Sequence, residues 1–405
     1  MNRVPLKRRP GPAKWIILGS GIVAALHLGK VAIAAPMLQA DLGIGLVQAG
    51  WLTGIFAVLG LFGGAPAGAV AVAIGHRKTL LMGLGFTAAA GITAAAAPSF
   101  DTLLATRLVE GLGFLLIVVA GPAILERLFA GAERDRALSL WSCFMPCGMA
   151  LAMVIGPAFQ TWQWLWWSSS ALTAIIAAIA ICCIPQDEPL HTQGQPFPGM
   201  RQALSRSTTL LAITFALYSL MFFALFAFLP VLLMDRMDVT YRGAGLLSAL
   251  VSAVNIGGNL AAGYLMARGA GRGALIILAS GLMGAAGLGI FTGVFGPVAT
   301  LMLCLLFSAV GGLIPATLLA SAPLSVREAT LVPVAVGILM QGSNLGQLLG
   351  PIIVGGLTAA HGWGAAGPVV LLAALAACIA VLLLSAVFPS NGQTLWLSGR
   401  IRRTS

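Results

Sequence analysis

Long apolar runs dominate this sequence. Twelve stretches of about 20 residues, each almost free of charge and bounded by charged residues or by Pro and Gly clusters, follow one another along the 405 residues. Charged residues make up 8% of the sequence and the mean hydropathy is +1.00, so the chain lacks the charged surface that a water-soluble protein of this length needs. In lipid, only helices bond the whole backbone within one such run. The sequence therefore predicts an all-α membrane protein with twelve transmembrane helices.

The expected helices form two groups of six. Their ranges are 15–37, 47–72, 79–97, 102–125, 137–160, 162–184, 207–234, 243–267, 274–294, 297–322, 331–358 and 366–388. A polar stretch with several prolines separates the sixth helix from the seventh and is typical of a linker. We expect an N-terminal six-helix bundle at 1–184, a cytoplasmic linker at 185–206, and a C-terminal six-helix bundle with a short basic tail at 207–405.

The basic residues predict the orientation of the helices. With the N-terminus inside, 18 of the 22 Lys and Arg residues fall in the tails and cytoplasmic loops, and only Arg236 and Arg242 fall outside. Both termini are therefore expected in the cytoplasm, in a multi-pass protein of the cell inner membrane. The net charge of +11 is spread over short loops rather than gathered on one surface, which argues against a nucleic-acid partner.

Two features of the sequence have ordinary explanations. The segment Ala-Ile-Ala-Ala at 32–35 follows a basic start and resembles a signal-peptide cleavage site, but the run before it is as long as a full span and contains His27 and Lys30. The cysteines lie within expected helices without the spacing of a disulfide framework or a zinc site, at positions Cys143, Cys147, Cys182, Cys183, Cys304 and Cys378. We expect neither a metal nor a cofactor.

The two halves repeat each other in part. Ala49-Gly50 and Ala67-Gly68 align with Ala244-Gly245 and Ala262-Gly263 at an offset of 195 residues, and Gly156-Pro157 aligns with Gly350-Pro351 at an offset of 194. Chance matches are common in a chain with 51 glycines, yet the pattern favours two halves of similar architecture.

Two motifs resemble those of the major facilitator superfamily. The segment from Gly68 to Lys78, with Gly75 and Arg77, is similar to the family's cytoplasmic loop motif, but Val72 and Ala73 replace its acidic and basic pair. Arg107-Leu-Val-Glu110-Gly111-Leu-Gly113 is similar to the family's Arg-x-x-Gln-Gly-x-Gly pattern. The resemblance covers residues 15–388 and implies a secondary transporter that works by alternating access.

The resemblance is less specific about the branch of the family. Gly148 and Gly156-Pro157 match only part of the motif of antiporters, which weakens the case for a drug/proton antiporter. Trp141-Ser142 and the stretch from Met145 to Gly148 loosely resemble the cyanate and nitrate uptake branch.

Four polar residues inside the expected spans are the main candidates for function. Lys30, Arg107, Glu110 and His27 are costly in lipid and should face a cavity or a partner. Each pair, His27 with Lys30 and Arg107 with Glu110, is spaced i, i+3 and shares a helical face. Lys30 lies roughly 6 Å, and Glu110 roughly 5 Å, to the outside of its span's midpoint, so their depths match.

The charges of this group predict the substrate. With His27 neutral they sum to one positive charge, which favours a small anion as substrate. Glu110 is the only acid in the spans and therefore the candidate proton-coupling residue, with His27 as the next candidate. The alternative is that the charges only cross-link helices.

The second half offers uncharged candidates for substrate binding. These are Tyr218 in an aromatic run with Phe222 and Phe226, Asn255, Gln341 and Asn344. Interhelical hydrogen bonding and ordinary packing are the alternative roles.

Several functions thus stay open. The sequence favours proton-coupled symport of a small anion across the bilayer by a monomer. An efflux pump for hydrophobic or cationic compounds and a non-transporting membrane sensor are the alternatives. Met145, Met149 and Met153 lie on one face near Cys143 and Cys147, which leaves a Cu(I) route as a minor alternative. No motif of an enzyme or of ATP binding is present in the sequence, so we expect no enzymatic activity.

Overall fold

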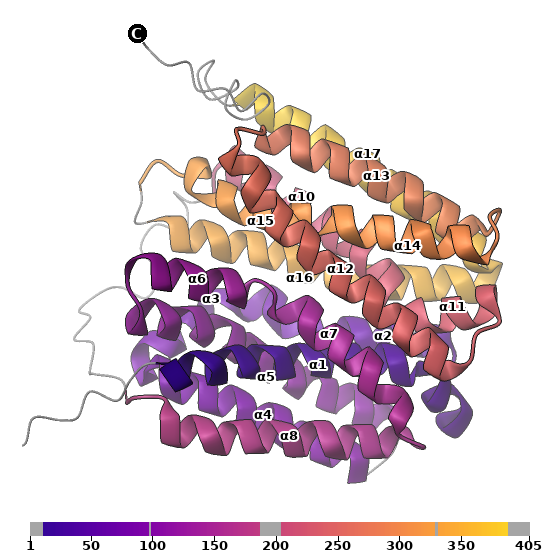
Figure 1. The fold of residues 1–405 in the computed structure, drawn as a ribbon, viewed down its shortest axis with the longest axis horizontal. Coiled ribbons are helices and arrows are strands. Elements are labelled where there is room, and N and C mark those ends of the chain that lie inside the picture. Colours follow the sequence, from indigo (N-terminus) through magenta and orange to yellow (C-terminus); the bar gives the residue numbers. More distant parts are fainter. Residues whose placement is uncertain (1–10, 97–98, 187–203, 329–330, 388–405) are drawn as a thin grey trace, which may run out of the picture.

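The expected all-helical membrane architecture is confirmed. The computed structural model describes residues 11–96, 99–186, 204–328 and 331–387, and within these ranges every regular element is a helix. Twelve helices are long and apolar enough to cross a membrane, and each coincides with one of the predicted runs. Figure 1 shows these helices lying roughly parallel in two bundles, one from each half of the chain. Most of the expected linker and the basic tail lie outside the described residues.

The first bundle holds six spans, two of them divided into shorter helices. Its elements are α1 (Gly11–Leu42), α2 (Leu46–Gly54), η1 (Ile55–Ala57), α3 (Val58–Ile74), α4 (His76–Ala96), α5 (Phe100–Leu128), α6 (Gly131–Trp141), α7 (Phe144–Ile155), η2 (Gly156–Ala158) and α8 (Trp162–Cys183). Ser99 begins α5 by accepting a hydrogen bond from the Thr102 N–H at 3.2 Å. Gly75 ends α3 with a φ of 95°, which only glycine adopts readily.

The second bundle repeats this pattern. Its elements are α10 (Arg206–Phe226), α11 (Leu229–Met237), α12 (Tyr241–Ala267), α13 (Arg272–Thr292), α14 (Pro297–Gly311), α15 (Leu313–Ser321), η3 (Ala322–Ser325), α16 (Val332–His361), η5 (Trp363–Ala365) and α17 (Ala366–Val387). Pro230 stands in the first turn of α11, where its missing N–H costs no hydrogen bond. The helix is interrupted just before it, between the end of α10 and the start of α11.

The two bundles touch through the glycines of the sequence repeat. A side chain on Gly50 of α2 would collide with the backbone of Pro351 in α16. A Cβ on Gly245 of α12 would lie 2.6 Å from Cγ of Pro157 and 2.7 Å from the carbonyl oxygen of Met153 in α7. Gly50 matches Gly245 in the repeat, and Pro157 matches Pro351. The repeat therefore marks two pseudo-equivalent contacts in which the absence of a side chain lets helices of opposite halves approach.

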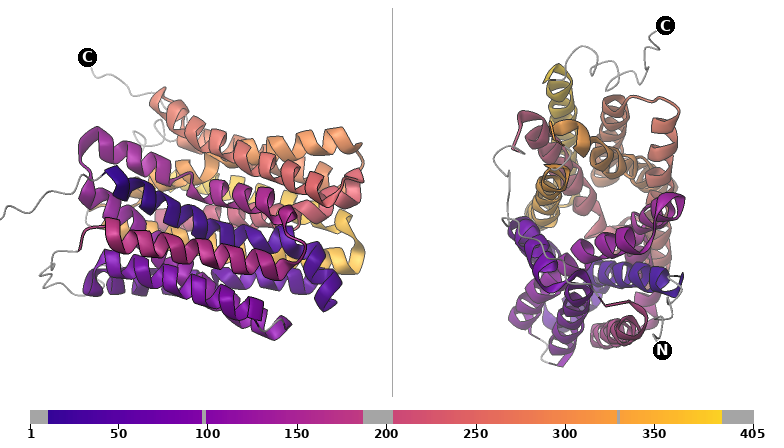
Figure 2. Two further views of the ribbon diagram at one scale, coloured as in Figure 1. Left: turned by 60° about the horizontal axis from the view of Figure 1, so that its bottom comes forward. Right: turned by 90° about the vertical axis from the view of Figure 1, so that its left-hand side faces the viewer.

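These contacts concentrate at one end of the molecule. At that end the Tyr241 hydroxyl of α12 donates to the Ile33 carbonyl of α1 at 2.9 Å. Further along α3, Gly60 packs against Asn344, but side chains at Gly68 and Gly263 would meet no atom within 4 Å. The bundles are thus joined at the end that carries residues 42–46 and 237–241. The right-hand view of Figure 2 shows the first bundle on one side and the second on the other.

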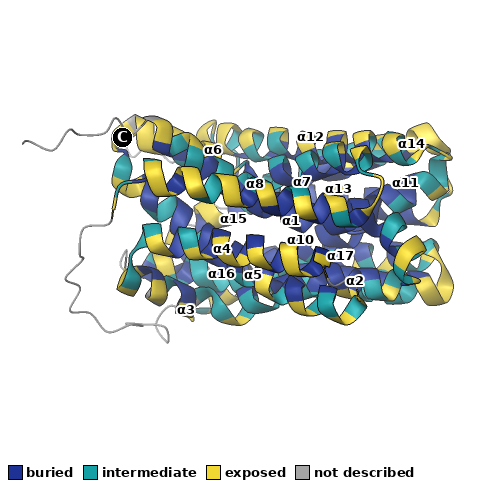
Figure 3. Ribbon diagram, turned by 90° about the horizontal axis from the view of Figure 1, so that it is seen from below, coloured by how far each residue is buried: buried dark blue, intermediate teal, exposed yellow. Residues whose placement is uncertain are grey.

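Burial is consistent with lipid as the surrounding solvent. Figure 3 shows exposed residues along the outer helices and buried residues in the helices at the middle of the molecule. Large apolar side chains are exposed there, among them Phe62, Trp164, Leu278 and Leu372. Such apolar exposure is costly in water and suits a hydrocarbon environment.

Candidate functional site

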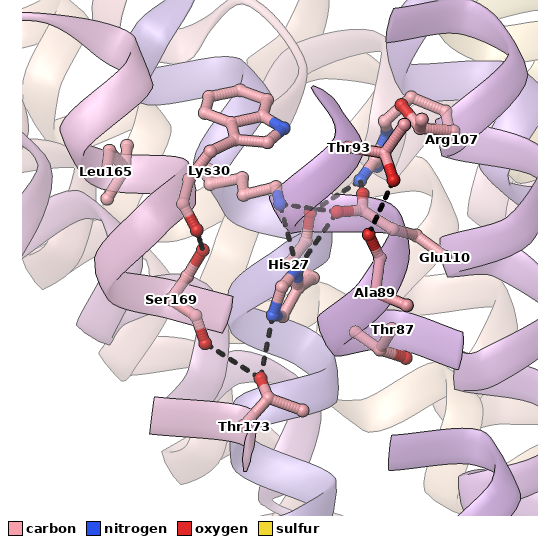
Figure 4. A network of polar contacts seen from close by, with 12 residues as sticks. His27, Lys30, Thr87, Ala89, Thr93, Arg107, Glu110, Leu165, Ser169 and Thr173 are labelled. Atoms are coloured by element: carbon pink, nitrogen blue, oxygen red, sulfur yellow. Dashed lines mark hydrogen bonds and ion pairs between the residues drawn. The ribbon is translucent and has the colours of Figure 1, made fainter. Parts of the chain in front are cut away.

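The four predicted polar residues meet inside the first bundle. His27 and Lys30 come from the middle of α1, and Arg107 and Glu110 from α5, and all four side chains are 0% exposed. Figure 4 shows them converging in one network of polar contacts. The i, i+3 pairs do share a face, and the two faces meet at the common depth that the sequence predicted.

Glu110 lies between the two cations. Its Oε1 accepts a hydrogen bond from the Lys30 ammonium at 2.6 Å, and its Oε2 is ion-paired with Arg107. Both carboxylate oxygens therefore bond to a charged donor, which is the arrangement that makes a buried carboxylate tolerable.

Arg107 also joins three helices through backbone groups. Its Nη1 donates to the His27 carbonyl of α1 at 2.8 Å, and its Nε donates to the Leu52 carbonyl of α2 at 3.0 Å. Its guanidinium carbon lies 4.3 Å from the ring centroid of Phe56, so the cation also stacks on an aromatic face. A lysine has neither the reach nor the fork of donors for these contacts.

His27 connects Lys30 to the sixth span. Lys30 Nζ lies 2.8 Å from His27 Nδ1, and His27 Nε2 lies 2.9 Å from the Thr173 hydroxyl of α8. Thr173 in turn donates to the Ser169 carbonyl at 2.8 Å. Figure 4 shows this chain of contacts running from Lys30 through His27 to Thr173.

Three buried donors near this network have no protein partner among the described residues. They are Nη2 of Arg107, Nε1 of Trp166 and the hydroxyl of Ser170. The Lys30 ammonium lies over the face of the Trp166 ring, with Nζ 4.5 Å from the ring centroid. Trp166 and Ser170 belong to the same helix, α8. A Cβ on Gly91 of α4 would collide with the Ser170 hydroxyl and lie 3.3 Å from Oε1 of Glu110, so α4 must present glycine here.

The network carries more positive than negative charge. Lys30 and Arg107 face Glu110 alone, so the sum is one positive charge when His27 is neutral. The neighbouring side chains that the structure describes, Phe56, Trp166 and Thr173, bring no charge. This surplus is enclosed in protein, where an unbalanced charge is costly unless a proton leaves or an anion approaches.

The candidates of the second half are separate from the network. Tyr218 on α10 is buried in an aromatic row, 6.1 Å from Phe215 and 5.9 Å from Phe222 by ring centroids. Asn255 on α12 donates to the Ser308 carbonyl of α14 at 2.9 Å, an interhelical bond within the same half.

The two candidate amides of α16, Gln341 and Asn344, and the next amide along this helix differ in their surroundings. Asn344 donates to the Met340 carbonyl at 2.9 Å and faces Gly60 of the opposite half. Gln341 is partly buried. Gln347, which follows them along the helix, is 3% exposed with its Nε2 unpaired among the described residues.

The loop motif lies at the other end of the molecule from the joined contacts. Gly68 is near open space, Gly75 makes the turn between α3 and α4, and Lys78 is exposed. Arg77 donates to the Ile181 carbonyl of α8 at 2.6 Å. With Val72 and Ala73 in place of the charged pair, this hydrogen bond ties α4 to α8 at that end.

The methionine row packs as apolar core. Met149 and Met153 are buried, and Met149 lies against the backbone of α1, where a Cβ on Gly29 would be 3.0 Å from its Cα. Cys143 donates to the Ser139 carbonyl at 3.7 Å. In the described part of the chain no three His, Cys, Asp or Glu residues gather as metal ligands.

Sequence reasoning missed the contribution of α8. Trp166, Ser169, Ser170 and Thr173 follow the spacing i, i+3, i+4, i+7 and so form one helical face. A polar stripe of this kind inside a span indicates contact with polar groups of another helix. Here those groups are His27 and Lys30 of α1.

The family of the chain follows from a match over most of its length. A sequence model described as Major Facilitator Superfamily matches residues 17–333. The chain belongs to this superfamily of membrane transporters.

Curated relatives in this family differ in their transported compounds. The chain is 27% identical over 236 residues to the 3-(3-hydroxy-phenyl)propionate transporter of Escherichia coli (strain K12), covering 56% of this chain and 58% of the relative. It is 26% identical over 188 residues to the puromycin resistance protein pur8 of Streptomyces alboniger, covering 44% of this chain and 37% of the relative. The chain thus spans less than two thirds of the length of these relatives.

A solved structure matches the whole fold. It is a bacterial homologue of the human lysosomal transporter Spinster, in an inward-facing and occupied conformation. The TM-score is 0.76 at 16% identity, over 94% of this chain and 98% of the other.

Proposed function

We propose that the chain is a secondary active transporter that moves a small organic anion together with protons. The observation that carries this proposal is the surplus positive charge of the buried Lys30, Arg107 and Glu110 network. Anion and proton binding favour each other in such a site, because a proton keeps it positive and an anion neutralises it.

The surplus charge attracts an anionic substrate even when the substrate does not touch the charged side chains. At a distance of about 8 Å and an effective dielectric constant of about 20, one unit charge stabilises an anion by about 2 kcal/mol. This corresponds to about a 30-fold gain in affinity. An anion in an adjacent cavity is therefore favoured over a cation by the same field.

The relatives support an aromatic carboxylate as the substrate class. One of them is named for 3-(3-hydroxy-phenyl)propionate, which is such an anion. In the second half, Tyr218, Asn255, Gln341 and Asn344 would then orient the uncharged part of the substrate. A second candidate function is efflux of drug-like compounds, which the resistance proteins among the relatives favour. A place near the cyanate and nitrate branch rests only on the residues 141–148.

We further propose alternating access between the two bundles in the cell inner membrane, with both termini in the cytoplasm. The contacts between the bundles lie at the end of residues 42–46 and 237–241, which the basic residues predict to be outside. This arrangement corresponds to an inward-facing state, like that of the similar solved structure. A monomer with six helices in each half suffices for this motion.

The transport proposal predicts a proton-coupled flux. In liposomes with the purified protein, 3-(3-hydroxyphenyl)propionate should enter faster when the outside is more acidic. One proton with one monovalent anion moves no net charge, so an imposed membrane potential should leave the rate unchanged, while each pH unit supplies a tenfold driving ratio. The measured quantity is the initial rate above that of protein-free liposomes, since the uncharged acid also crosses lipid.

Puromycin serves as the comparison compound for this experiment. Faster flux of puromycin than of the carboxylate would support the efflux alternative. A carboxylate flux that follows the membrane potential and ignores the pH difference would reject the symport proposal.

The orientation is tested by labelling single introduced cysteines in a variant without the six native ones. Thiols at His76 and Thr192 should react with an impermeant reagent only from the cytoplasmic side, and a thiol at Met237 only from outside. Position 192 lies outside the described residues, so its labelling also tests the expected cytoplasmic linker. Labelling of 192 from the periplasm would contradict the division into six plus six helices.

A further inference from the structure

The hydrogen atoms of the network can be assigned from its neutral partners. The Thr173 hydroxyl has one hydrogen, and it donates this hydrogen to the Ser169 carbonyl at 2.8 Å. The Thr173 oxygen must then accept from Nε2 of His27, which lies 2.9 Å away. A neutral His27 therefore carries its hydrogen on Nε2, and its Nδ1 presents a lone pair.

The Lys30 ammonium uses this lone pair. It has three hydrogens, of which one points to His27 Nδ1 at 2.8 Å and one to Glu110 Oε1 at 2.6 Å. The remaining side of the ammonium makes a cation–π contact with the Trp166 ring, whose centroid lies 4.5 Å from Nζ. Every hydrogen-bonding atom at the junction of Lys30 and His27 is thus satisfied while the lysine is charged and the histidine is neutral.

A second position for the same proton also has an acceptor in place. When the Nζ–H bond breaks and an Nδ1–H bond forms, Lys30 becomes a neutral amine and His27 an imidazolium. Nδ1 lies 3.2 Å from Glu110 Oε1, so the new N–H faces a carboxylate oxygen that is already in place. The proton moves within one hydrogen bond, and the total charge of the network stays the same.

Glu110 is poorly placed to receive a proton. Both of its oxygens face charged donors, Lys30 and Arg107, and the nearby lone pair of His27 Nδ1 is already occupied by Lys30. Protonation of this carboxylate would leave two cations without an anion, a surplus of two charges. Loss of a proton from Lys30 or His27 instead leaves Arg107 and Glu110 as a balanced pair.

No other ionisable group faces this junction from the helices packed on it that the structure describes. From α2 and η1 come Leu52 and Phe56, from α4 Gly91, and from α8 Trp166 and Thr173. From α7, which packs on α1 beside Lys30, come Met149 and Ala152 against Gly29. The ionisable residues of α4 lie in its first turn, far along the helix from Gly91. The network therefore has two low-cost charge states, one positive and neutral, which differ by one proton.

We propose that the transported proton is carried by the hydrogen-bonded pair of Lys30 and His27, while Glu110 stays ionised as the counter-ion of Arg107. This inference rests on the proposed proton coupling and names its carrier, where the sequence alone indicated Glu110. In this pair two nitrogen bases share the proton that a carboxyl group would otherwise carry.

Nuclear magnetic resonance of the protein in liposomes tests the carrier without any substrate. The chain has four lysines and four histidines, so K7R, K14R, K78R, H76Q, H191Q and H361Q together leave Lys30 and His27 as the only residues of their type. The network itself remains intact in this variant. With nitrogen-15 in Lys and His and carbon-13 in Glu, Lys30 Nζ and His27 Nδ1 should respond to pH with one common midpoint. The Glu110 carboxyl carbon, assigned by its loss in E110Q, should stay constant over the same range.

Either of two results would overturn this inference. One is a Glu110 carbon that titrates, and the other is a Lys30 nitrogen that does not respond between pH 5 and 9. Binding of 3-(3-hydroxyphenyl)propionate is measured separately and should weaken about 30-fold above the common midpoint. Absence of binding with an intact titration would reject the proposed substrate class alone, so the two failures are distinguishable.

Discussion

Replacing Arg107 with alanine should destabilise the protein by about 3–5 kcal/mol, the usual cost of breaking a buried ion pair from one side. The substitution removes donors to the His27 and Leu52 carbonyls and leaves Glu110 with Lys30 alone. Because these bonds link α1, α2 and α5, the first bundle should loosen as a whole. Equilibrium unfolding of the purified protein in mixed micelles measures this loss.

Arg136→Ala is the matched control. Arg136 is an exposed arginine at the other end of the bundle, on α6, and its loss should change the free energy of unfolding by less than about 0.5 kcal/mol. Equal stabilities of the Arg107 and Arg136 variants would show that the backbone contacts of Arg107 contribute little, and would return this residue to a role in substrate binding alone.

The hydrogen bonds of Arg107 show what the sequence can and cannot predict about the site. Helical spacing and matching depth indicated that the polar faces of α1 and α5 lie at one level of the membrane, and the structure brings them together at His27, Lys30 and Glu110. Spacing could not predict which group each side chain bonds to, because these hydrogen bonds depend on the exact path of the neighbouring backbones. Arg107 reaches the Leu52 carbonyl two residues before the end of α2, where that helix gives way to η1.

The polar face of α8 is a second case. Its serine and threonine residues were within reach of the same periodicity argument, but small hydroxyl residues in a span bond to their own helix as readily as to a neighbour. Thr173 does both, since it donates to Ser169 and faces His27. Only the position of α1 reveals the second contact.

The fold was more fully predictable than the site. Twelve apolar runs and the distribution of basic residues determine the number of helices, since lipid leaves the backbone no other way to bond. The glycine repeat indicated two similar halves, and the pairing of Gly50 with Pro351 and of Gly245 with Pro157 gives it a physical meaning. Which glycines make contact depends on the conformational state, which no single sequence specifies.

Two adjacent glycines of α16 distinguish the contact face from its neighbour. A Cβ on Gly355 would lie 2.6 Å from the Leu46 carbonyl of α2 and 3.1 Å from the Phe228 ring, whereas a Cβ on Gly356 would meet nothing within 4 Å. A leucine at Gly355 must therefore push α2 and α16 apart, and a leucine at Gly356 has room. The joined end of the molecule depends on this difference.

Gly355→Leu should therefore strongly reduce pH-driven uptake of 3-(3-hydroxyphenyl)propionate, and Gly356→Leu should leave it largely intact. Overpacking of this kind costs about 1–3 kcal/mol, which lowers the population of the joined state by roughly 5- to 150-fold relative to a state open at that end. Spin labels at the exposed residues Val47 and Ala359 report the separation of α2 and α16. Their distance should increase in Gly355→Leu and stay unchanged in Gly356→Leu. If both variants keep the short distance and only Gly355→Leu loses transport, the leucine acts on the substrate path and the contact between α2 and α16 is no gate.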